Sequence, residues 1–500
     1  EESLAWEGTF LDYLDLVRQN PRIAQSAHSR IYEMIISAGV EMVGEHKRYK
    51  FFADELFGLD EALDGEGLSP SDRALATELV YGVTRWRGRL DWALGLLCDR
   101  PLEDLPVWIR NILRMGLYQL AFLERVPAWA AVAESVSLAR EFGHRGTARL
   151  VNAVLRRAAS EGVPDSGERG RPVDQAVGLA VEHSHPEWLV RRWLARLGED
   201  KTRELLRLDN EPAPLTLRVN TTRTDREGLA RRLAGEGVEA VPGRLFPEAL
   251  HCRTVRPVRQ LRAYAEGLFS VQDEGAMAAA RTVAPRPGWL VVDACAGVGG
   301  KSTHLAELMG GRGRVVAVDL FEHKLALLER TARRLGLEGI QTRRLDAREL
   351  GSTDLAGAAD AVLVDAPCSG LGVLRRRPDL RWRLKEKDFG DLVRLQGELL
   401  EAAATCVKQG GVLVYATCSL EPEENEGVVE GFLARNLEFA ADEAAAAAGL
   451  SGSVHGAGPA GRYLQLWPER GGHDGFFVAR MVRRAGRSRV SVAARLGDRA

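Results

Sequence analysis

The sequence has little of what would suit an oxidising compartment or a membrane. Its six cysteines are scattered over 500 residues without a CxxC pair, so neither a disulfide framework nor a zinc site is expected. No run of about 18 uncharged apolar residues occurs, which argues against a membrane span. The first residues contain no basic segment followed by an apolar stretch, so we expect no secretory signal. These absences predict a protein of the reducing cytoplasm that binds no metal.

The sequence also lacks a strong net charge. Its 68 Lys and Arg residues and 70 Asp and Glu residues leave a formal charge of −2, which excludes a polycation. A role with nucleic acid would therefore depend on local basic patches. Five hundred residues are also too many for one hydrophobic core, so we expect several domains.

The hydrophobic pattern changes several times along the chain. It is helical and aromatic-rich at first, and helical throughout from Ser69 to about Ser160. A stretch rich in Gly, Pro and charge follows, then a strand–helix–strand pattern that predicts a small α/β module. The predicted segments are an N-terminal segment (1–61), an all-α domain (62–160), a linker and helical connector (161–211), the small α/β module (212–285), a sheet domain (286–483) and a basic tail (484–500).

Short apolar strands alternate with helices in the sheet domain, which predicts a doubly wound, mostly parallel, Rossmann-like sheet. Ligands of such sheets bind at the carboxyl ends of the strands. The first strand runs into a glycine-rich turn, "DACAGVGGKST", and later strands end at Asp319, Asp346 and Asp365. The turn has neither GxGxxG nor GxxxxGK[ST] spacing, and the acids favour a nucleoside-bearing ligand. Alternatively, each aspartate only caps the helix that follows it.

Two cysteines stand at the ends of neighbouring predicted strands, Cys368 in "DAPCSG" and Cys418 in "ATCS". We interpret Cys98, Cys252 and Cys406 as small buried hydrophobic residues, but a thiol at a strand end can meet a ligand. A thiolate that adds to carbon 6 of a cytosine makes carbon 5 nucleophilic toward an electrophilic methyl group, which is covalent catalysis. A carboxyl group at the N3 and N4 edge of the base would stabilise the adduct.

The segment from Asp293 to Arg480 resembles the RNA 5-methylcytosine methyltransferases, which use S-adenosyl-L-methionine. The resemblance rests on "DAPCSGLGVLRRRPDLRW", "LVYATCSLEPEENE", "VQDEGA" and "GFFVAR". It implies that Cys418 is the nucleophile, that Cys368 assists product release and that Asp365 belongs to the catalytic set. The implied cofactor residues are Cys295, Ala296, Gly297, Val298, Gly299, Gly300, Lys301, Asp319, Asp346 and Asp365. The family usually has CAAPGGK where this chain has "CAGVGGK". The loop thus loses a proline with its fixed φ, and we expect an altered cofactor affinity.

The helical domain is similar to the NusB-like domain of the RsmB branch of that family, also called Sun or Fmu. The segments that carry this likeness are "LVYGVTRWRGRLDW", "ILRMGLYQLAFLERVPAWAAVAESV" and "ARLVNAVLRR". The branch methylates a cytosine of 16S ribosomal RNA, which implies small-subunit RNA as the partner. We expect a monomer. Residues 4–60 resemble instead the N-terminal segment of PrkA-type serine protein kinases, but without a phosphate-binding loop.

An arginine cluster interleaved with Trp382 follows the first of the two cysteines. Such a pattern suits phosphate contact and base stacking, although charge runs are more often solvated faces. The expected RNA-binding residues are Arg375, Arg376, Arg377 and Arg381. A second hypothesis for the whole chain is a non-catalytic RNA-binding or ribosome assembly factor, against which the intact cysteine pair argues.

Overall fold

The structure is a computed structural model that describes residues 40–43, 46–49, 70–165, 174–254, 257–450, 456–457 and 462–484. The chain divides into two compact units, Glu1–Leu206 and Arg207–Ala500, and each is considered by itself.

Strands β1 (Val40–Val43) and β2 (His46–Tyr49) form an antiparallel pair, so the helical pattern expected over 1–61 is wrong there. Valine and tyrosine in these strands favour extended backbone. Most of the segment with the PrkA resemblance lies outside the described residues.

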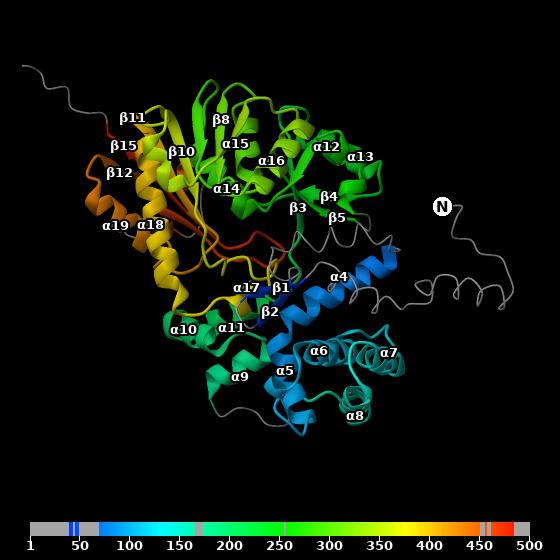
Figure 1. Ribbon diagram of the computed structural model, residues 1–500. Helices are drawn as coiled ribbons and strands as arrows, with labels where there is room; N and C mark the ends of the chain where they lie inside the picture. Colours follow the sequence, from blue (N-terminus) through cyan, green and yellow to red (C-terminus); the bar gives the residue numbers. More distant parts are fainter. Residues whose placement is uncertain are drawn as a thin grey trace, which may run out of the picture. The chain divides into compact units, whose positions relative to one another are not determined.

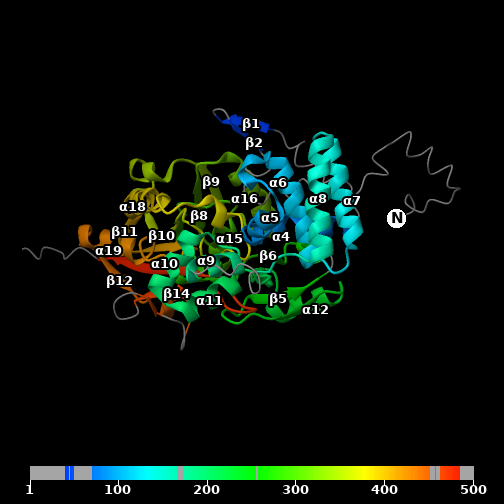
Figure 2. The same cartoon turned by 90° about the horizontal axis from the view of Figure 1, so that it is seen from below.

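The first unit is otherwise helical in its described part, as the apolar spacing predicts. Its helices are α4 (Pro70–Arg85), α5 (Arg87–Leu97), η3 (Leu102–Asp104), α6 (Val107–Phe122), α7 (Ala128–Glu141), α8 (Arg145–Glu161), α9 (Gln175–Glu182), α10 (Glu187–Leu197) and α11 (Glu199–Leu208), which runs into the second unit. Leu94, Ile112, Leu117 and Leu155 are fully buried in its core. Helices α7 and α8 lie side by side (Figure 2).

The second unit begins with a small α/β module. Its elements are β3 (Leu215–Val219), α12 (Arg226–Ala234), β4 (Glu239–Pro242), β5 (Ala249–Arg253), η4 (Val258–Gln260), α13 (Arg262–Ala265) and β6 (Phe269–Val271). The strands form an antiparallel sheet in the order β4-β5-β3-β6. The strand–helix–strand pattern predicted β3, α12 and β4, but neither β5 nor the three-residue β6.

A larger mixed sheet fills the rest of the unit (Figure 1). Five parallel strands stand in the order β11-β10-β7-β8-β9, and antiparallel strands β15, β14 and β13 extend the β11 edge, while β12 also pairs with β15. The strands are β7 (Leu290–Asp293), β8 (Arg314–Asp319), β9 (Ile340–Arg344), β10 (Ala359–Asp365), β11 (Val407–Thr417), β12 (Phe439–Asp442), β13 (Gly456–Ala457), β14 (Tyr463–Leu466) and β15 (Phe476–Arg483). Strands β8 and β9 follow β7 on one side, and β10 and β11 lie on its other side, so the strand order reverses between β7 and β10. Doubly wound sheets bind their ligands at such a reversal.

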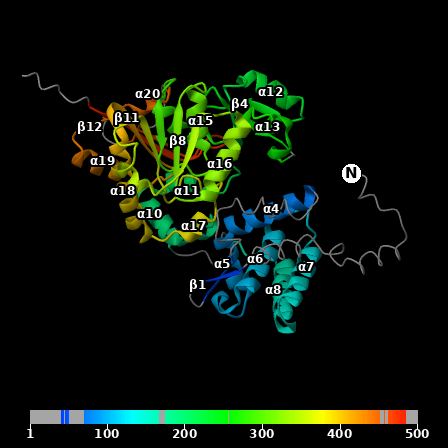
Figure 3. The ribbon, with the colours of Figure 1, turned by 45° about the horizontal axis from the view of Figure 1, so that its top comes forward.

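Helices cover both faces of this sheet, so its central strands are apolar on both sides. The two layers are visible in Figure 3. One face packs against η5 (Ala347–Ser352), α18 (Asp388–Cys406) and α19 (Glu426–Arg435); the other packs against α14 (Glu274–Val283), α15 (Gly300–Leu308), α16 (Glu322–Leu335) and α20 (Ala444–Ala447). The short helix α17 (Leu380–Arg383) follows the first cysteine loop. In the part of the chain that the structure describes, no helix is long and apolar enough to cross a membrane.

Candidate active site

The two strand-end thiols meet at the carboxyl edge of the sheet. Strands β10 and β11 are parallel neighbours; Cys418 directly follows β11, and Cys368 lies three residues after β10. Their Sγ atoms are 3.3 Å apart, within hydrogen-bond distance for sulfur. The hydrogen bond to Cys418, burial and the nearby charges raise the pKa of the Cys368 thiol well above its ordinary value. Cys368 therefore stays a neutral thiol.

A lysine and an aspartate lie beside these thiols. The ammonium of Lys301, in the first turn of α15, donates a 2.5 Å hydrogen bond to Oδ2 of Asp365 at the end of β10. Burial alone would lower the pKa of Lys301, but the carboxylate of Asp365, the charge of Cys418 and that of Asp293 raise it overall. The site thus holds a charged ammonium group close to Cys418, and such a charge favours a thiolate.

The glycine-rich loop and Asp319 are joined at the ends of β7 and β8. Gly297 and Gly299 have φ angles of +55° and +88°, which suit glycine alone. A Cβ on Gly299 would meet Leu328, whereas a Cβ on Gly297 would stand in open space. Oδ2 of Asp319 accepts a 2.9 Å hydrogen bond from the N–H of Gly297, and Oδ1 accepts one from the N–H of Phe321. The loop therefore presents open backbone at its turn, with a carboxylate beside it.

Asp346 behaves differently from the other strand-end acids. It accepts hydrogen bonds from the backbone N–H and the guanidinium of Arg348, whose side chain lowers the pKa of the carboxyl. It also caps η5. The contacts of Asp346 are thus those of a helix-capping aspartate. A ligand would have to share its carboxylate with Arg348.

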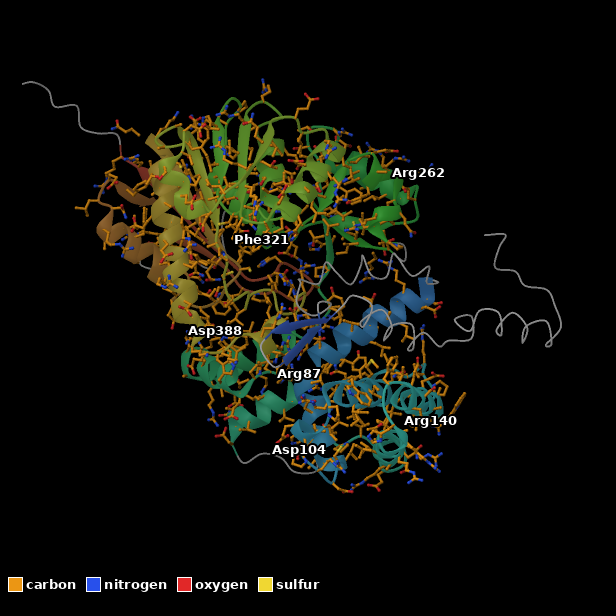
Figure 4. All side chains as sticks on the ribbon, viewed as in Figure 1. Arg87, Asp104, Arg140, Arg262, Phe321 and Asp388 are labelled. Carbon is orange, nitrogen blue, oxygen red and sulfur yellow. The ribbon has the colours of Figure 1, made fainter. Side chains whose placement is uncertain are left out.

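Two further residues at this edge escaped the sequence analysis. Asp293 ends β7 and is fully buried; its Oδ2 accepts a 2.6 Å hydrogen bond from Ser302, while Oδ1 has no hydrogen-bond partner among the described residues. Burial raises the pKa of Asp293 to about 6. Phe321, labelled in Figure 4, is a half-exposed aromatic ring two residues after Asp319. The strand-end rule that selected Asp319 could have selected Asp293 as well.

Cys295, in the glycine-rich loop, is no candidate nucleophile. Burial and the charges of Asp293, Asp365 and Asp319 raise the pKa of its thiol well above the ordinary value. The residue therefore stays a neutral thiol. Among the described residues, no group of three or more His, Cys, Asp or Glu side chains is arranged to hold a metal ion.

Two arginines of the cluster after Cys368 are buried and have partners within the protein. Arg375 is 2% exposed, pairs with Asp474 and donates hydrogen bonds to the backbone carbonyls of Glu469 and Gly472. Arg381 is fully buried and donates to Asn210 Oδ1 and to the Asp209 carbonyl. Both guanidinium groups are used in holding loops together, and RNA contact by Arg375 and Arg381 stays a prediction.

The other two arginines of the cluster remain accessible in part. Arg376 is partly exposed and pairs with Asp273 and Asp474. Arg377 is also half-buried. RNA contact by Arg376 and Arg377 stays a prediction.

Comparison with known proteins gives three consecutive family matches. Residues 31–160 match the NusB family, residues 185–259 the ferredoxin-like domain of RsmF/B-like methyltransferases, and residues 280–482 the family described as 16S rRNA methyltransferase RsmB/F. The NusB match begins inside the segment 4–60. The resemblance of that segment to PrkA-type kinases is not supported.

Curated relatives align over most of the chain. A probable ribosomal RNA small subunit methyltransferase B of Bacillus subtilis is 39% identical over 423 residues, which are 85% of this chain and 93% of the relative. Ribosomal RNA small subunit methyltransferase B of Pseudomonas syringae is 35% identical over 429 residues, covering 84% and 91% of the two chains.

Solved structures have the same fold. The crystal structure of PH0851 is 28% identical and matches with a TM-score of 0.74 over 85% of this chain and 94% of its own. NSun6 from Pyrococcus horikoshii, determined with SFG, is 23% identical, with a TM-score of 0.53 over 60% of this chain and 98% of its own. With this agreement in sequence over most of its length, the chain belongs to the RsmB/F family of 16S rRNA methyltransferases, which are S-adenosylmethionine-dependent enzymes.

Proposed function

We propose that this chain transfers a methyl group from S-adenosyl-L-methionine to carbon 5 of a cytosine in small-subunit ribosomal RNA, through a covalent adduct with Cys418. The observation that carries the proposal is the pair of thiols 3.3 Å apart, next to the ion pair of Lys301 and Asp365. A methyltransferase acting on a more nucleophilic atom would need neither thiol. Ribosomal RNA as the substrate fits an enzyme of the cytoplasm. Free cysteines fit it as well, because thiols stay reduced in that compartment.

The strand-end residues suit S-adenosyl-L-methionine. The open backbone at Gly297 and the carboxylate of Asp319 can bind a ribose and its neighbouring groups, and the unpartnered Oδ1 of Asp293 is a buried acceptor nearby. We assign the cofactor to the loop Cys295–Lys301 with Asp319, Asp346 and Asp365. When bound, the cofactor supplies an electrophilic methyl group. Val298 stands where the family has proline, so we expect the loop to order at a greater entropic cost.

Cys418 is the thiol that we assign to attack. Its sulfur adds to carbon 6 of the base as a thiolate, and a bond between sulfur and carbon 6 forms. The ammonium of Lys301 stabilises the negative charge before the attack, and the thiol of Cys368 donates a hydrogen bond to the same sulfur. Cys368, whose pKa is raised, stays a neutral thiol beside the attacking sulfur.

Asp365 holds the base during the attack. Its Oδ2 accepts the hydrogen bond from Lys301, and its other oxygen can accept one from the N4 amino group of cytosine. The electron pair displaced from the C5–C6 double bond makes carbon 5 the nucleophile.

The adduct must then be undone. Once carbon 5 carries the methyl group, it gives up its proton to water, the double bond to carbon 6 re-forms, and the bond to sulfur breaks with Cys418 leaving as a thiolate. Cys368 is the group beside that sulfur which we assign to assist this step. Two neighbouring thiols thus divide the attack and the release between them.

Bisulfite sequencing tests the proposal against the alternative of a non-catalytic assembly factor. Purified protein, S-adenosyl-L-methionine and 16S rRNA, either naked or in small-subunit particles, should yield a cytosine protected from bisulfite, and omission of the cofactor should abolish the protection. An assembly factor would bind either RNA without protecting any cytosine.

A further inference from the structure

We propose that Glu424 is a positioning residue that holds Cys368 and Cys418 at contact distance by binding the serine that follows each of them. This inference rests on the proposed function, because it concerns the two thiols assigned there. Glu424 lies six residues after Cys418, in the turn before α19, and its side chain is 0% exposed.

One carboxylate joins the two cysteine loops. Oε1 of Glu424 accepts a 2.8 Å hydrogen bond from the backbone N–H of Ser369, and Oε2 accepts a 2.5 Å hydrogen bond from the hydroxyl of the same serine. Oε2 also accepts a 2.5 Å hydrogen bond from the hydroxyl of Ser419. The two serine oxygens are 3.0 Å apart. Each serine is covalently next to one of the thiols, so the carboxylate sets the spacing of the loops.

The surroundings of Glu424 support a positioning role rather than an ion pair. Gln396 of α18 donates a 2.9 Å hydrogen bond to Oε1 and a second one to the carbonyl of Pro367, in the first cysteine loop. In the described part of the chain no lysine or arginine pairs with Glu424. A buried carboxylate without a cation is costly, and it persists where several donors fix it in one geometry.

The backbone of the second loop is held as well. The hydroxyl of Tyr415 donates to the backbone carbonyl of Glu424, and the N–H of Gly372 donates a 2.8 Å hydrogen bond to the carbonyl of Cys418. These bonds hold the backbone of the two cysteine loops. The side chain of Glu424 contacts both loops at the residues next to the sulfur atoms. Its negative charge also contributes to the raised pKa of Cys368.

Thiol cross-linking measures the spacing without any need for catalysis. Dibromobimane bridges two thiols that are close together, and mass spectrometry identifies the bridged peptides. The wild-type protein should form the Cys368–Cys418 bridge. Glu424→Ala should form it at least about tenfold more slowly, whereas Glu424→Gln, whose amide can donate to both serine hydroxyls, should stay near the wild-type rate. Glu423→Ala, at the exposed neighbouring acid, is the matched control.

The chemical steps supply the second measurement. RNA that contains 5-fluorocytidine has no C5 proton to lose, so it accumulates the adduct on a denaturing gel. Glu424→Ala should slow this accumulation by about 10- to 100-fold, because a small displacement of the reacting groups is enough. Ser419→Ala should slow the attack, and Ser369→Ala should instead leave adduct trapped on ordinary RNA. The serine variants test the proposal even if Glu424→Ala does not fold.

The proposal is overturned if folded Glu424→Ala, or both serine variants, keep the wild-type rates of cross-linking and adduct formation. It is also overturned if the serine variants lose both steps equally, in proportion to a lowered melting temperature, since that is the behaviour of a structural residue. If Cys418→Ala still methylates RNA, the proposed covalent mechanism is wrong. The cross-linking rates of the Glu424 variants then still test whether Glu424 sets the distance between the two thiols.

Discussion

Cys368 and Cys418 share one hydrogen bond but face different tasks, so their replacements should fail differently. Cys418→Ala should abolish methyl transfer and form no covalent RNA complex, since no sulfur remains to attack carbon 6. Cys368→Ala should still attack and methylate, then stall with the protein bound to RNA through Cys418. A denaturing gel with labelled RNA separates the two outcomes.

The thiol assignment has a direct control and a clear contradiction. Cys98→Ala, at a half-buried cysteine of the first unit, should behave like the wild type. A trapped band with Cys418→Ala but not with Cys368→Ala would mean that the two roles are reversed. Normal turnover in both variants would mean that the mechanism is not covalent.

Asp319 permits a second prediction at the scale of one residue. It shapes the glycine-rich loop through the N–H of Gly297, and we assign it to the ribose of the cofactor. Asp319→Ala should weaken the binding of S-adenosyl-L-methionine by roughly 1.5–3 kcal/mol, the worth of hydrogen bonds to a charged group. Titration calorimetry measures the affinity. An unchanged dissociation constant would remove Asp319 from the cofactor site.

At the scale of elements, the sequence predicted well what depends on local pattern. Strand ends, the alternation of strands and helices, and the placing of Cys368, Cys418 and Asp365 follow from residue periodicity and from one rule about parallel sheets. It predicted poorly what depends on distant partners. Arg375 looks like surface charge in the sequence, yet its partner Asp474 lies 99 residues away and takes it into the interior.

The segment after Cys368 therefore has a structural role that can be measured. Arg375 ties it to the loop 469–474 through one ion pair and two carbonyl contacts. Arg375→Ala should lower the free energy of unfolding by about 1.5–3 kcal/mol, because Asp474 loses one of its two guanidinium partners and keeps Arg376. Urea unfolding followed by circular dichroism gives the value. A variant of unchanged stability that flattens the salt dependence of RNA binding would instead support a phosphate contact by Arg375.

At the scale of the whole second unit, the small module and the large sheet are joined by buried polar groups. Arg218 of β3 is fully buried; it donates to Glu307 and Thr303 of α15 and, over 2.6 Å, to the carbonyl of Gly300 in the glycine-rich loop. The module that leads the unit thus supports the first turn of the helix at the cofactor loop. Nothing in the residues "PLTLRVN" distinguishes this arginine from an exposed one, because Gly300, Thr303 and Glu307 lie more than 80 residues further along the chain.

The same junction contains a histidine that should make the stability of the unit depend on pH. His304 of α15 is buried, and its Nε2 lies 3.0 Å from Oε1 of Glu248, which also pairs with Arg281. Burial lowers the pKa of His304 to about 4; Glu248 opposes this shift, and Arg218 and Arg281 add to it. The folded protein therefore keeps His304 neutral where the unfolded chain already takes up a proton.

The sign of the effect follows from that difference. The contribution of neutral His304 is fully present above the unfolded pKa of 6.5 and is lost as the pH falls toward 4, by roughly 2–3 kcal/mol. Urea unfolding of the wild type and of His304→Gln over this range isolates the contribution, since other acids titrate in both proteins. The wild type should lose more stability than the variant as the pH falls. Equal losses would mean that His304 is protonated in the folded state, and that the junction tolerates a third cation beside Arg218 and Arg281.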